Sequence, residues 1–378
     1  MTDLSDLIAL RHSLHRHPEV SRAEQATAAL IAKELQSLQA AEVIEGLGGH
    51  GVAAVFHGRG EGPTVMLRAE LDALPIAETS GVGHASLLPG RGHLCGHDGH
   101  MAILMGVAQK VALRPLARGR LVCLFQPAEE DGSGAAAVLA DPAFAALRPD
   151  WAFALHNMPG QPLGAARVSA GPSNCASVGL RLRFLGRTAH AATPQTGLSP
   201  VPAVLALVPA VQALSRDQAL VPGFRLVTLT HVRIGEPTFG IAPGEAEVFL
   251  TLRCMLDADM AALRAEVMRL AEAEAAAHGL ELMVDWHDDF AACHNDAEAV
   301  ARIEKALLET GTPFGPAETM RASEDFGRFG GSGTKSAMFL LGAGEQHPAL
   351  HDPNYDFPDA IIPVGVAVFT ALVEDLLD

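Results

Sequence analysis

Residues 94–100, Leu94-Cys-Gly-His-Asp-Gly-His100, place one thiol and two imidazole groups directly before an apolar helical stretch. Cys95 and His97 are two residues apart, so in an extended segment both side chains would point to one side and could bind a shared metal ion. Asp98 suits the N-cap of the following helix, because its carboxylate can accept a backbone hydrogen bond from the first turn. For this stretch alone, a buried cysteine beside a capping loop is an equally good interpretation.

The composition indicates a two-domain globular protein with an acidic surface. The chain has 378 residues, of which 49% are hydrophobic, and this is enough apolar material for two domain cores. Lys plus Arg is 27 and Asp plus Glu is 44, so the net charge is −17, which argues against nucleic acid or an anionic membrane as partner. We find neither a signal-peptide pattern nor a run of about 18 uncharged apolar residues. The five scattered cysteines do not indicate a disulfide framework, so a cytoplasmic protein is expected.

Alternating strand and helix patterns predict an α/β domain in the first part of the chain. The predicted elements are strands at 51–56, 64–71, 119–126 and 151–155 and a helix at 101–112. The last three strands lead into Asp72, into Gln126-Pro-Ala-Glu-Glu130, and into His156-Asn157. Open α/β sheets place their chemistry at the carboxyl ends of strands, so we expect these polar residues to lie together.

The pattern changes after Gly171-Pro172, where strands and helices follow in the order β-α-β-β-α-β of a ferredoxin-like unit. These elements are predicted at 177–185, 200–215, 224–234, 245–256, 259–277 and 280–286. A helix at 295–309 and a polar loop at 347–356 then return to the first pattern. We therefore predict an α/β catalytic domain of residues 1–171 and 291–378, with a central mixed sheet flanked by helices, and an inserted ferredoxin-like α+β lid domain of residues 172–290.

Side chains of metal-binding type stand at predicted strand ends or in loops: Cys95, His97, Glu130, His156 and His351. Each one alone is most often a hydrogen-bonded loop or surface residue. As a set, five ligands of which one bridges fill six of the eight positions of two four-coordinate ions, and a bridging hydroxide would fill the other two. The set fits a dinuclear hydrolase. Thiolate and imidazole favour zinc or a neighbouring transition metal over magnesium or calcium.

Two further carboxylates have candidate roles. Glu129 precedes Glu130, and neighbouring side chains diverge at a strand end, so one carboxylate can bind metal while Glu129 acts as general base. Asp72 ends a buried strand and could orient a ligand imidazole. A helix or turn cap is an equally good interpretation of Asp72.

Several segments carry a family resemblance, in order along most of the chain: Leu67-Arg-Ala-Glu-Leu-Asp-Ala-Leu-Pro-Ile76, Cys95-Gly-His-Asp-Gly-His100, Gln126-Pro-Ala-Glu-Glu130, Leu155-His-Asn157, Gly186-Arg-Thr-Ala-His190 and Leu350-His-Asp-Pro-Asn-Tyr-Asp-Phe357. Together they resemble the M20 metallopeptidase family, and within it the amidohydrolase branch of hippurate hydrolases, N-acyl-amino-acid deacylases and indole-3-acetyl-amino-acid hydrolases.

The resemblance implies two divalent ions, which could be Mn, Zn, Co or Ni, in a catalytic domain that carries an inserted lid. It implies that Glu129 is the base and that His190, in the lid, reaches the oxyanion of the scissile carbonyl, often across a homodimer. Arg253 matches the lid arginine of the family and is a candidate clamp for a substrate carboxylate, although a surface arginine is an equally good interpretation. Asn157 is a second candidate for substrate binding. The implied metal ligands are the five named above: Cys95, His97, Glu130, His156 and His351.

The sequence departs from the family pattern at two places. Asp131 follows the Glu-Glu pair where the family often has a glycine run, which would add a carboxylate near the metals. Gly240-Ile-Ala-Pro243 stands where the family usually has Asn-Val-Ile-Pro, and that Asn is associated with gripping the substrate. Asp98 and His100 match the motif but are not ligands in the family.

The predicted function is metal-dependent hydrolysis of the amide bond of an N-acyl amino acid or a similar small amide. A dipeptidase or aminopeptidase-like activity on small peptides is the enzymatic alternative. A non-catalytic small-ligand-binding protein of the same fold would be indicated by loss of Glu129 or a ligand, and none is lost. A thiol hydrolase that uses Cys95 with a histidine would stay active in the presence of a chelator.

Overall fold

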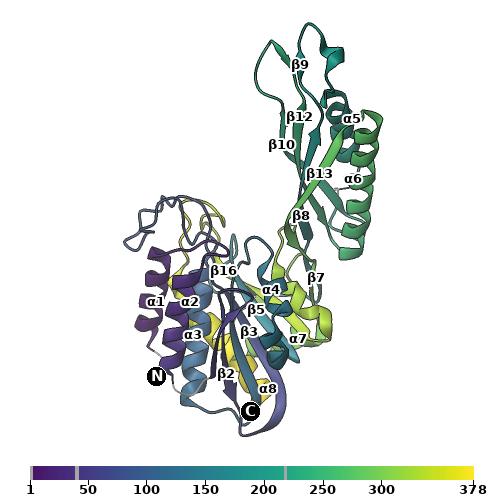
Figure 1. Ribbon diagram of the computed structural model, residues 1–378. Coiled ribbons are helices and arrows are strands. Elements are labelled where there is room, and N and C mark those ends of the chain that lie inside the picture. The colour runs from purple at the N-terminus through teal and green to yellow at the C-terminus, as the bar shows by residue number, and fades with distance from the viewer. Residues whose placement is uncertain (1–2, 39–41, 217–218) are drawn as a thin grey trace. The chain divides into compact units, whose positions relative to one another are not determined.

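The computed structural model describes residues 3–38, 42–216 and 219–378, which form two compact units (Figure 1). Unit 1 comprises Met1–Ser173, His294–Glu318 and Asp325–Asp378, and unit 2 comprises Asn174–Cys293 and Thr319–Glu324. The chain thus leaves unit 1, builds unit 2 and returns, and a short later segment goes back to unit 2.

Unit 1 is built on a mixed sheet with the strand order β1-β2-β4-β3-β5-β16-β6-β15. Strands β4, β3, β5 and β16 are parallel neighbours, whereas β2 is antiparallel to both β1 and β4. The strand bounds are β1 Glu42–Leu47, β2 Gly51–His57, β3 Gly60–Glu70, β4 Arg118–Gln126, β5 Trp151–Pro159, β6 Ala166–Arg167, β15 Phe314–Gly315 and β16 Lys335–Gly344. The carboxyl ends of β3, β4 and β5 therefore lie at the same end of the sheet. The predicted α/β class with a mixed sheet flanked by helices is confirmed.

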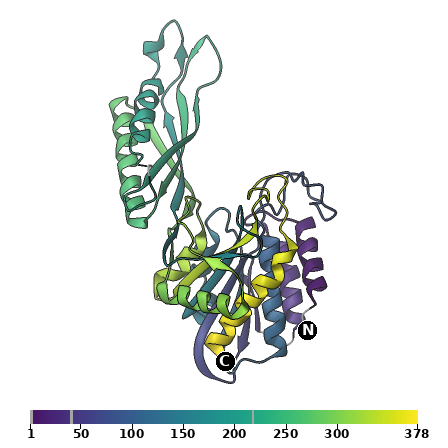
Figure 2. The same ribbon diagram turned by 180° about the vertical axis from the view of Figure 1, so that it is seen from behind.

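One face of this sheet carries the main core of unit 1. Alternate residues of β3, namely Val65, Leu67 and Ala69, are buried in the same cluster as apolar residues of α2, α3, α7 and α8, as the period of two along a strand requires. Figure 2 shows α7 and α8 side by side, and these two helices contact each other. The helices of unit 1 are α1 Leu4–Arg16, α2 Gln25–Ser37, α3 His97–Leu113, α4 Gly134–Ala140, α7 Ala297–Thr310 and α8 Ile362–Leu377.

Helix α8 is unusually apolar. With the turn before it, Asp359–Leu377, it is the only helix among the described residues that is long and apolar enough to cross a membrane, and 56% of its most apolar window is buried inside the protein. Its contacts with α3, α7 and β3 account for this composition, because an apolar helix enclosed by a core passes the same test.

Unit 2 is a four-stranded antiparallel sheet with the order β10-β12-β8-β13. Helices α5 and α6 pack on the face formed by alternate residues such as Val248, Leu250 and Leu252. A two-stranded ribbon of β9 and β11 is also part of this unit. The bounds are β8 Ala176–Leu185, β9 Ala189–His190, α5 Val201–Gln212, β10 Arg225–Ile234, β11 Ile241–Ala242, β12 Glu245–Cys254, α6 Asp257–Ala277 and β13 Glu281–Phe290.

The local predictions need two corrections. Asp98 does not cap α3: the helix begins at His97, and its N-cap is Gly96, whose φ of 93° and ψ of 14° are left-handed. Asp98 is instead fully buried in the first turn. In addition, β5 continues to Pro159, so His156 and Asn157 lie within the strand rather than after it. The apolar strand β16 and helix α8 are additions to the predicted elements.

Asp98 pairs with cationic side chains of α1. Its Oδ2 lies 2.8 Å from Nδ1 of His15 and 3.4 Å from Nη1 of Arg11, while Nε2 of His15 lies 3.2 Å from Oε1 of Glu78. Burial disfavours the charged imidazole, but the carboxylates of Asp98 and Glu78 outweigh this and raise the pKa of His15 to about 10. Helix α1 is therefore held to the start of α3 by buried ion pairs.

We expect His15→Gln to destabilise unit 1 in a pH-dependent way. The pKa of His15 rises from an ordinary 6.5 to about 10 on folding, so its contribution is complete below pH 6.5 and is lost as the pH rises toward 10. Removing one partner of a buried ion pair costs about 3–5 kcal/mol. Urea unfolding of wild type and variant should therefore differ most near pH 6 and converge toward pH 10. The exposed His17 provides the control variant His17→Gln, and a pH-independent difference for His15→Gln would contradict the assignment.

Candidate metal centre

The start of α3 places two side chains of metal-binding type on either side of a left-handed residue. Gly96 lies between Cys95 and His97, and its φ of 93° is strained for any residue with a Cβ. The chain thus turns sharply between the two, and His97 enters the first turn of the helix. A turn, and not an extended segment, therefore brings the side chains of Cys95 and His97 close to each other.

Candidate ligand atoms form two groups that share Cys95. In the first group, one atom each of Cys95, His97 and His156 lie within 4.8 Å of one another. In the second group, the same holds for Cys95, Glu130 and His351. The Sγ of Cys95 is 3.5 Å from Nε2 of His156, and Nε2 of His351 is 3.6 Å from Oε2 of Glu130. All five predicted ligands thus lie together, and the thiol belongs to both groups.

The imidazole rings are oriented by contacts on the nitrogen away from the cluster. Nδ1 of His97 donates to the backbone oxygen of Asp72 at 2.8 Å, and Nδ1 of His156 donates to the backbone oxygen of Asn157 at 2.8 Å. Nε2 of His97 is buried and has no hydrogen-bond partner among the described residues. A buried imidazole nitrogen without a partner is costly, and a bound cation would satisfy it. The donor set therefore fits divalent transition-metal ions.

Asp72 contacts two members of this cluster, His97 and Glu130. Its Oδ1 is 3.5 Å from Nδ1 of His97, and its Oδ2 accepts from the N–H of Glu130 at 2.9 Å and from Oγ of Ser21 at 2.7 Å. Burial alone would raise the pKa of Asp72, but the hydrogen bond and charge of His97 together with these donors lower it below the ordinary value. Asp72 is therefore a carboxylate that contacts the ring of one candidate ligand and accepts a hydrogen bond from the backbone of another.

Glu24 accepts a hydrogen bond from the loop that follows β4. No sequence pattern predicted a role for Glu24. Ala128 has a φ of 49°, and its N–H donates to Oε1 of the fully buried Glu24 at 2.8 Å. One carboxylate oxygen each of Glu129 and Glu130 lies within 4.8 Å of a ring nitrogen of His97. Glu129 is nearly buried, at 6% exposure, so its carboxylate is close to the cluster and shielded from bulk water.

Asp131 does not add a carboxylate to the cluster. Its Oδ2 pairs with Nε of Arg22 at 2.8 Å, and its Oδ1 accepts from the N–H of Ser133 at 3.0 Å. The expectation that this departure from the family pattern increases the negative charge at the metals is therefore wrong.

Asn157 is placed differently from the prediction of a substrate-binding residue. Its side chain is fully buried, and its Nδ2 donates to the hydroxyl of Tyr355 at 2.5 Å. The side-chain amide of Asn157 therefore contacts another buried residue of unit 1 and is not exposed to a substrate.

The remaining candidate residues lie in unit 2. His190 is exposed on β9, and Nδ1 of its ring accepts from the N–H of Ala192 at 3.1 Å, which places the ring proton on Nε2. β9 pairs with β11, so the N–H of Ala191 donates to the backbone oxygen of Gly240 at 3.0 Å. A Cβ at Gly240 would meet no atom within 4 Å. Residue 240, where the family usually has an asparagine, thus lies on an open surface beside His190.

Arg253 is more than a surface arginine. Its Nη1 donates to the backbone oxygen of Arg321 at 2.9 Å and to Oγ of Ser323 at 2.8 Å, which holds the segment 319–324 onto unit 2. Burial lowers the pKa of the guanidinium below its ordinary value, which remains far above neutral pH. Its Nε and Nη2 have no hydrogen-bond partner among the described residues.

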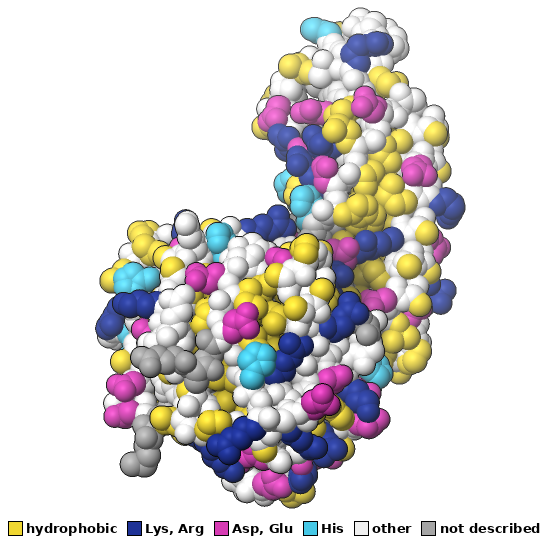
Figure 3. Space-filling view, turned by 60° about the horizontal axis from the view of Figure 1, so that its bottom comes forward, with side chains coloured by type: hydrophobic (Ala, Val, Ile, Leu, Met, Phe, Trp, Pro, Cys, Tyr) yellow, Lys and Arg dark blue, Asp and Glu magenta, His cyan; other side chains and the backbone are white. Residues whose placement is uncertain are grey.

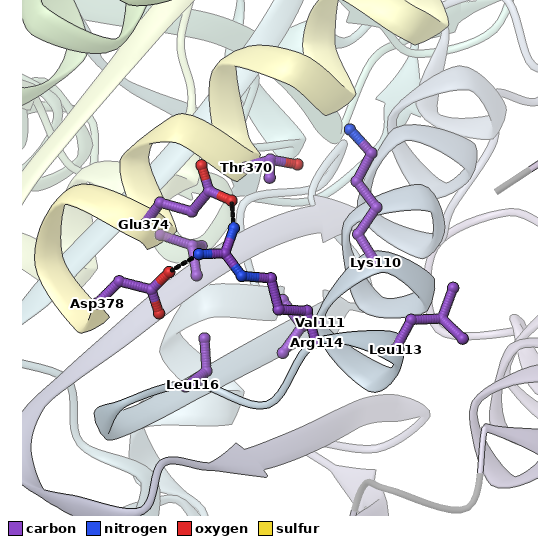
Figure 4. Close-up of a pocket in the computed structure, with 9 residues that line it drawn as sticks. Lys110, Val111, Leu113, Arg114, Leu116, Thr370, Glu374 and Asp378 are labelled. Atoms are coloured by element: carbon purple, nitrogen blue, oxygen red, sulfur yellow. Dashed lines mark hydrogen bonds and ion pairs between the residues drawn. The ribbon is translucent and has the colours of Figure 1, made fainter. Parts of the chain in front are cut away.

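A separate pocket of about 500 Å³ lies between the C-terminal ends of α3 and α8, and none of the candidate ligands lines it (Figure 4). Its central cation, Arg114, is already paired with Glu374 at 2.7 Å and with Asp378 at 3.0 Å. The remaining wall is mainly apolar. Of the ionisable side chains that line it, Lys110 is exposed and lies far along α3 from Cys95 and His97.

Comparison with known proteins gives a consistent result. Residues 66–375 match the profile of peptidase family M20/M25/M40. The chain is 30% identical to the N-acetylcysteine deacetylase of Bacillus subtilis (98% of this chain and 97% of that protein) and 28% identical to the hippurate hydrolase of Campylobacter jejuni (96% and 94%). A crystal structure from Bacillus subtilis, described as a dinuclear metal-binding peptidase, superimposes with a TM-score of 0.81 at 27% identity, covering 99% of this chain and 98% of that one.

We expect Asp72→Asn to weaken metal binding while leaving the fold intact. The amide keeps the shape of the carboxylate but removes the charge beside His97, and loss of such orienting partners typically costs 10- to 100-fold in metal affinity. Competition with a chelator measures the dissociation constant. Asp141→Asn is the matched control, because its carboxylate also accepts backbone hydrogen bonds, at 3.0 Å and 2.9 Å, but lies outside the cluster. Equal metal affinity in the Asp72→Asn and Asp141→Asn proteins would contradict the role of Asp72.

Proposed function

Because the chain belongs to peptidase family M20/M25/M40, we propose that it hydrolyses the amide bond of an N-acyl amino acid, releasing a carboxylic acid and an amine. The family predicted from the sequence motifs is confirmed. The observation that carries the proposal is the pair of ligand groups that share Cys95, next to the carboxylate of Glu129.

Cys95, His97 and His156 would hold one divalent ion, and Cys95, Glu130 and His351 would hold the other. Mn, Zn, Co and Ni all accept thiolate, imidazole and carboxylate ligands. Bound there, the two ions would supply Lewis-acid polarisation of the amide carbonyl and would acidify a water molecule. Thiol catalysis by Cys95 is less well supported, because its sulfur lies among four other ligand-type side chains rather than with one activating histidine.

The carboxylate of Glu129 is the proposed general base. Its neighbour Glu130 has its N–H fixed by Asp72, so the two side chains leave the loop at defined positions. Glu129 would take a proton from the attacking water and deliver it to the leaving nitrogen. Its near-complete burial keeps bulk water from competing for that proton.

We assign oxyanion binding to His190 and treat the predicted inserted domain of residues 172–290 as a lid that also forms a homodimer. The proton on Nε2 of His190 is available for donation, because Nδ1 already accepts from Ala192. Oxyanion donors typically contribute about 10²- to 10³-fold to kcat. If the lid acts across a dimer, mixing inactive Glu129→Gln and His190→Ala chains should restore activity. No recovery after verified subunit exchange would place His190 in the same chain as the site it serves.

For the substrate carboxylate we propose Arg253, through Nε and Nη2. The carboxylate of an N-acyl amino acid matches the fork of a guanidinium. A dipeptidase or aminopeptidase-like enzyme would instead require a free amine on its substrate, and a non-catalytic protein of this fold would not need Glu129 beside the ligands.

The remaining proposals concern location and partners. We expect a cytoplasmic protein that acts on a small molecule and binds neither nucleic acid nor membrane. On the face shown in Figure 3, cationic and acidic side chains are interspersed. The overall net charge of −17 supports the same conclusion.

The central test separates Glu129 from Glu130. Glu129→Gln should retain metal but lose about 10²- to 10⁴-fold in kcat, because general base catalysis typically contributes that much. Glu130→Gln should lose metal instead. Activity is measured on N-acetyl-, N-benzoyl- and indoleacetyl-amino acids and on dipeptides, with metal content determined in parallel. Full activity of exhaustively chelated wild-type protein, or hydrolysis of dipeptides only, would overturn the proposed function.

Substrate selection should change at Gly240. A Cβ added at residue 240 would meet no atom within 4 Å, and a new hydrogen bond from an asparagine to a carboxylate is worth about 1.5–3 kcal/mol, roughly 10- to 150-fold. We expect wild type to discriminate weakly between N-acyl amino acids and their carboxamides, and Gly240→Asn to increase the preference for the acid. The ratio of kcat/KM for matched acid and amide pairs measures this, with Thr230→Asn, at an exposed position on β10, as control. An unchanged ratio in Gly240→Asn would remove this position from substrate selection.

A further inference from the structure

A buried hydrogen bond connects two of the segments that carry the candidate ligands. Asn157 follows His156 directly on β5, and its Nδ2 donates to the hydroxyl of Tyr355 at 2.5 Å. Tyr355 lies four residues after His351 and is the only tyrosine of the chain. Both side chains are fully buried, so this bond is formed out of contact with solvent.

The same amide lies against the turn that carries two further candidate ligands, Cys95 and His97. A Cβ at Gly96 would lie 2.3 Å from Oδ1 and 2.8 Å from Cγ of Asn157, which means that the side-chain amide packs directly on the backbone between Cys95 and His97. The backbone N–H of Asn157 also donates to Nε2 of His100 at 3.2 Å. Asn157 therefore contacts the ligand-bearing turn, the first turn of α3 and, through Tyr355, the C-terminal loop.

The C-terminal loop is seated on the same turn. The N–H of His351 donates to the backbone oxygen of Leu94 at 2.8 Å. A Cβ at Gly99 would lie 2.4 Å from ring atoms of Phe357, so this ring packs closely on the start of α3. Burial raises the pKa of Tyr355 well above its ordinary value, which keeps the hydroxyl neutral.

We propose that Asn157 and Tyr355 are positioning residues that set the spacing between His156, the Cys95–His97 turn and His351, and that metal affinity depends on the hydrogen bond between them. This inference rests on the proposed metal site. Neither residue belongs to a ligand group. Their effect would be indirect, since a shift of β5 or of the C-terminal loop would move one ligand of each group away from Cys95.

The decisive variant is Tyr355→Phe, which removes the hydroxyl and retains the ring. Thr334→Val is the matched control, because the hydroxyl of Thr334 makes a buried hydrogen bond to the backbone oxygen of Pro149 at 2.8 Å in the same unit, away from the ligands. Both variants should lose a similar small amount of stability. Only Tyr355→Phe should weaken binding of Zn²⁺ and Co²⁺, by about 10- to 100-fold in chelator competition, and alter the thiolate-to-Co²⁺ absorption band of the loaded protein.

A second variant tests whether the two residues act together. Asn157→Ala should weaken metal binding at least as much as Tyr355→Phe, and the double variant should be no weaker than Asn157→Ala alone, because one hydrogen bond can be lost only once. Wild-type protein that binds no ions would overturn the proposed function. Wild-type protein that binds two ions, together with unchanged metal affinity and spectrum in Tyr355→Phe, would overturn this inference alone. Additive effects in the double variant would also overturn it.

Discussion

The carboxylate of Asp72 is the contact on which the ligand cluster depends. A fully buried carboxylate is stable only when its oxygens are paired. Asp72 contacts three segments at once: its Oδ1 lies 3.5 Å from the ring of His97, and its Oδ2 accepts hydrogen bonds from the backbone N–H of Glu130 and the hydroxyl of Ser21. Because Asp72 follows the central strand β3, these bonds tie the start of α3 and the loop after β4 to the sheet. Two candidate ligands are thus placed relative to each other before any ion is considered.

The face of β3 opposite to the main apolar core carries buried charged residues near the end of the strand. Arg68 pairs with Glu70 and, at 2.6 Å, with Asp325, while Gln126 donates to Asp325 at 2.9 Å. Glu70 in turn contacts Nδ1 of His100 at 2.6 Å. A network of this kind is costly if one member is missing and rigid if all are present. It connects the ends of β3 and β4 to the first turn of α3, so the platform under the site resists small displacements.

The candidate ligands could be proposed from the sequence because their side-chain types are distinctive and most of them stand at the ends of predicted strands, although they are far apart along the chain. A thiol, imidazoles and paired carboxylates that occur together at strand ends fit few roles besides metal binding. The role of Asp98 could not be predicted in the same way, because its partners Arg11 and His15 are 87 and 83 residues away. A short polar residue before a helix suggests a cap, and only the tertiary fold shows that buried cations neutralise it. The prediction for Asp131 was wrong for the same reason, since its partner Arg22 is distant in sequence.

The buried ion network beneath the site also has a signal in the sequence. Arg68 and Glu70 alternate with apolar residues along a strand predicted to be buried, and charged residues in such a strand require partners. The alternation therefore indicates that Arg68 and Glu70 form buried ion pairs near the carboxyl end of β3. The left-handed backbone at Gly96 is harder to foresee, because a glycine in a loop is compatible with many conformations. The space for a side chain at residue 96 is taken by Asn157, which lies on β5, far from Gly96 in sequence.

The two units differ in how strongly packing determines their functional residues. In unit 1, Asp72, His97 and Asn157 are fully buried, and each makes polar contacts with other buried groups. In unit 2, His190 is exposed and Gly240 has open space around it. A side chain at residue 240 would therefore neither strain the ribbon nor disturb the core. Packing therefore constrains the candidate metal centre tightly, whereas the surface beside His190, where we propose that substrate preference is set, can accept substitutions without disturbing the core.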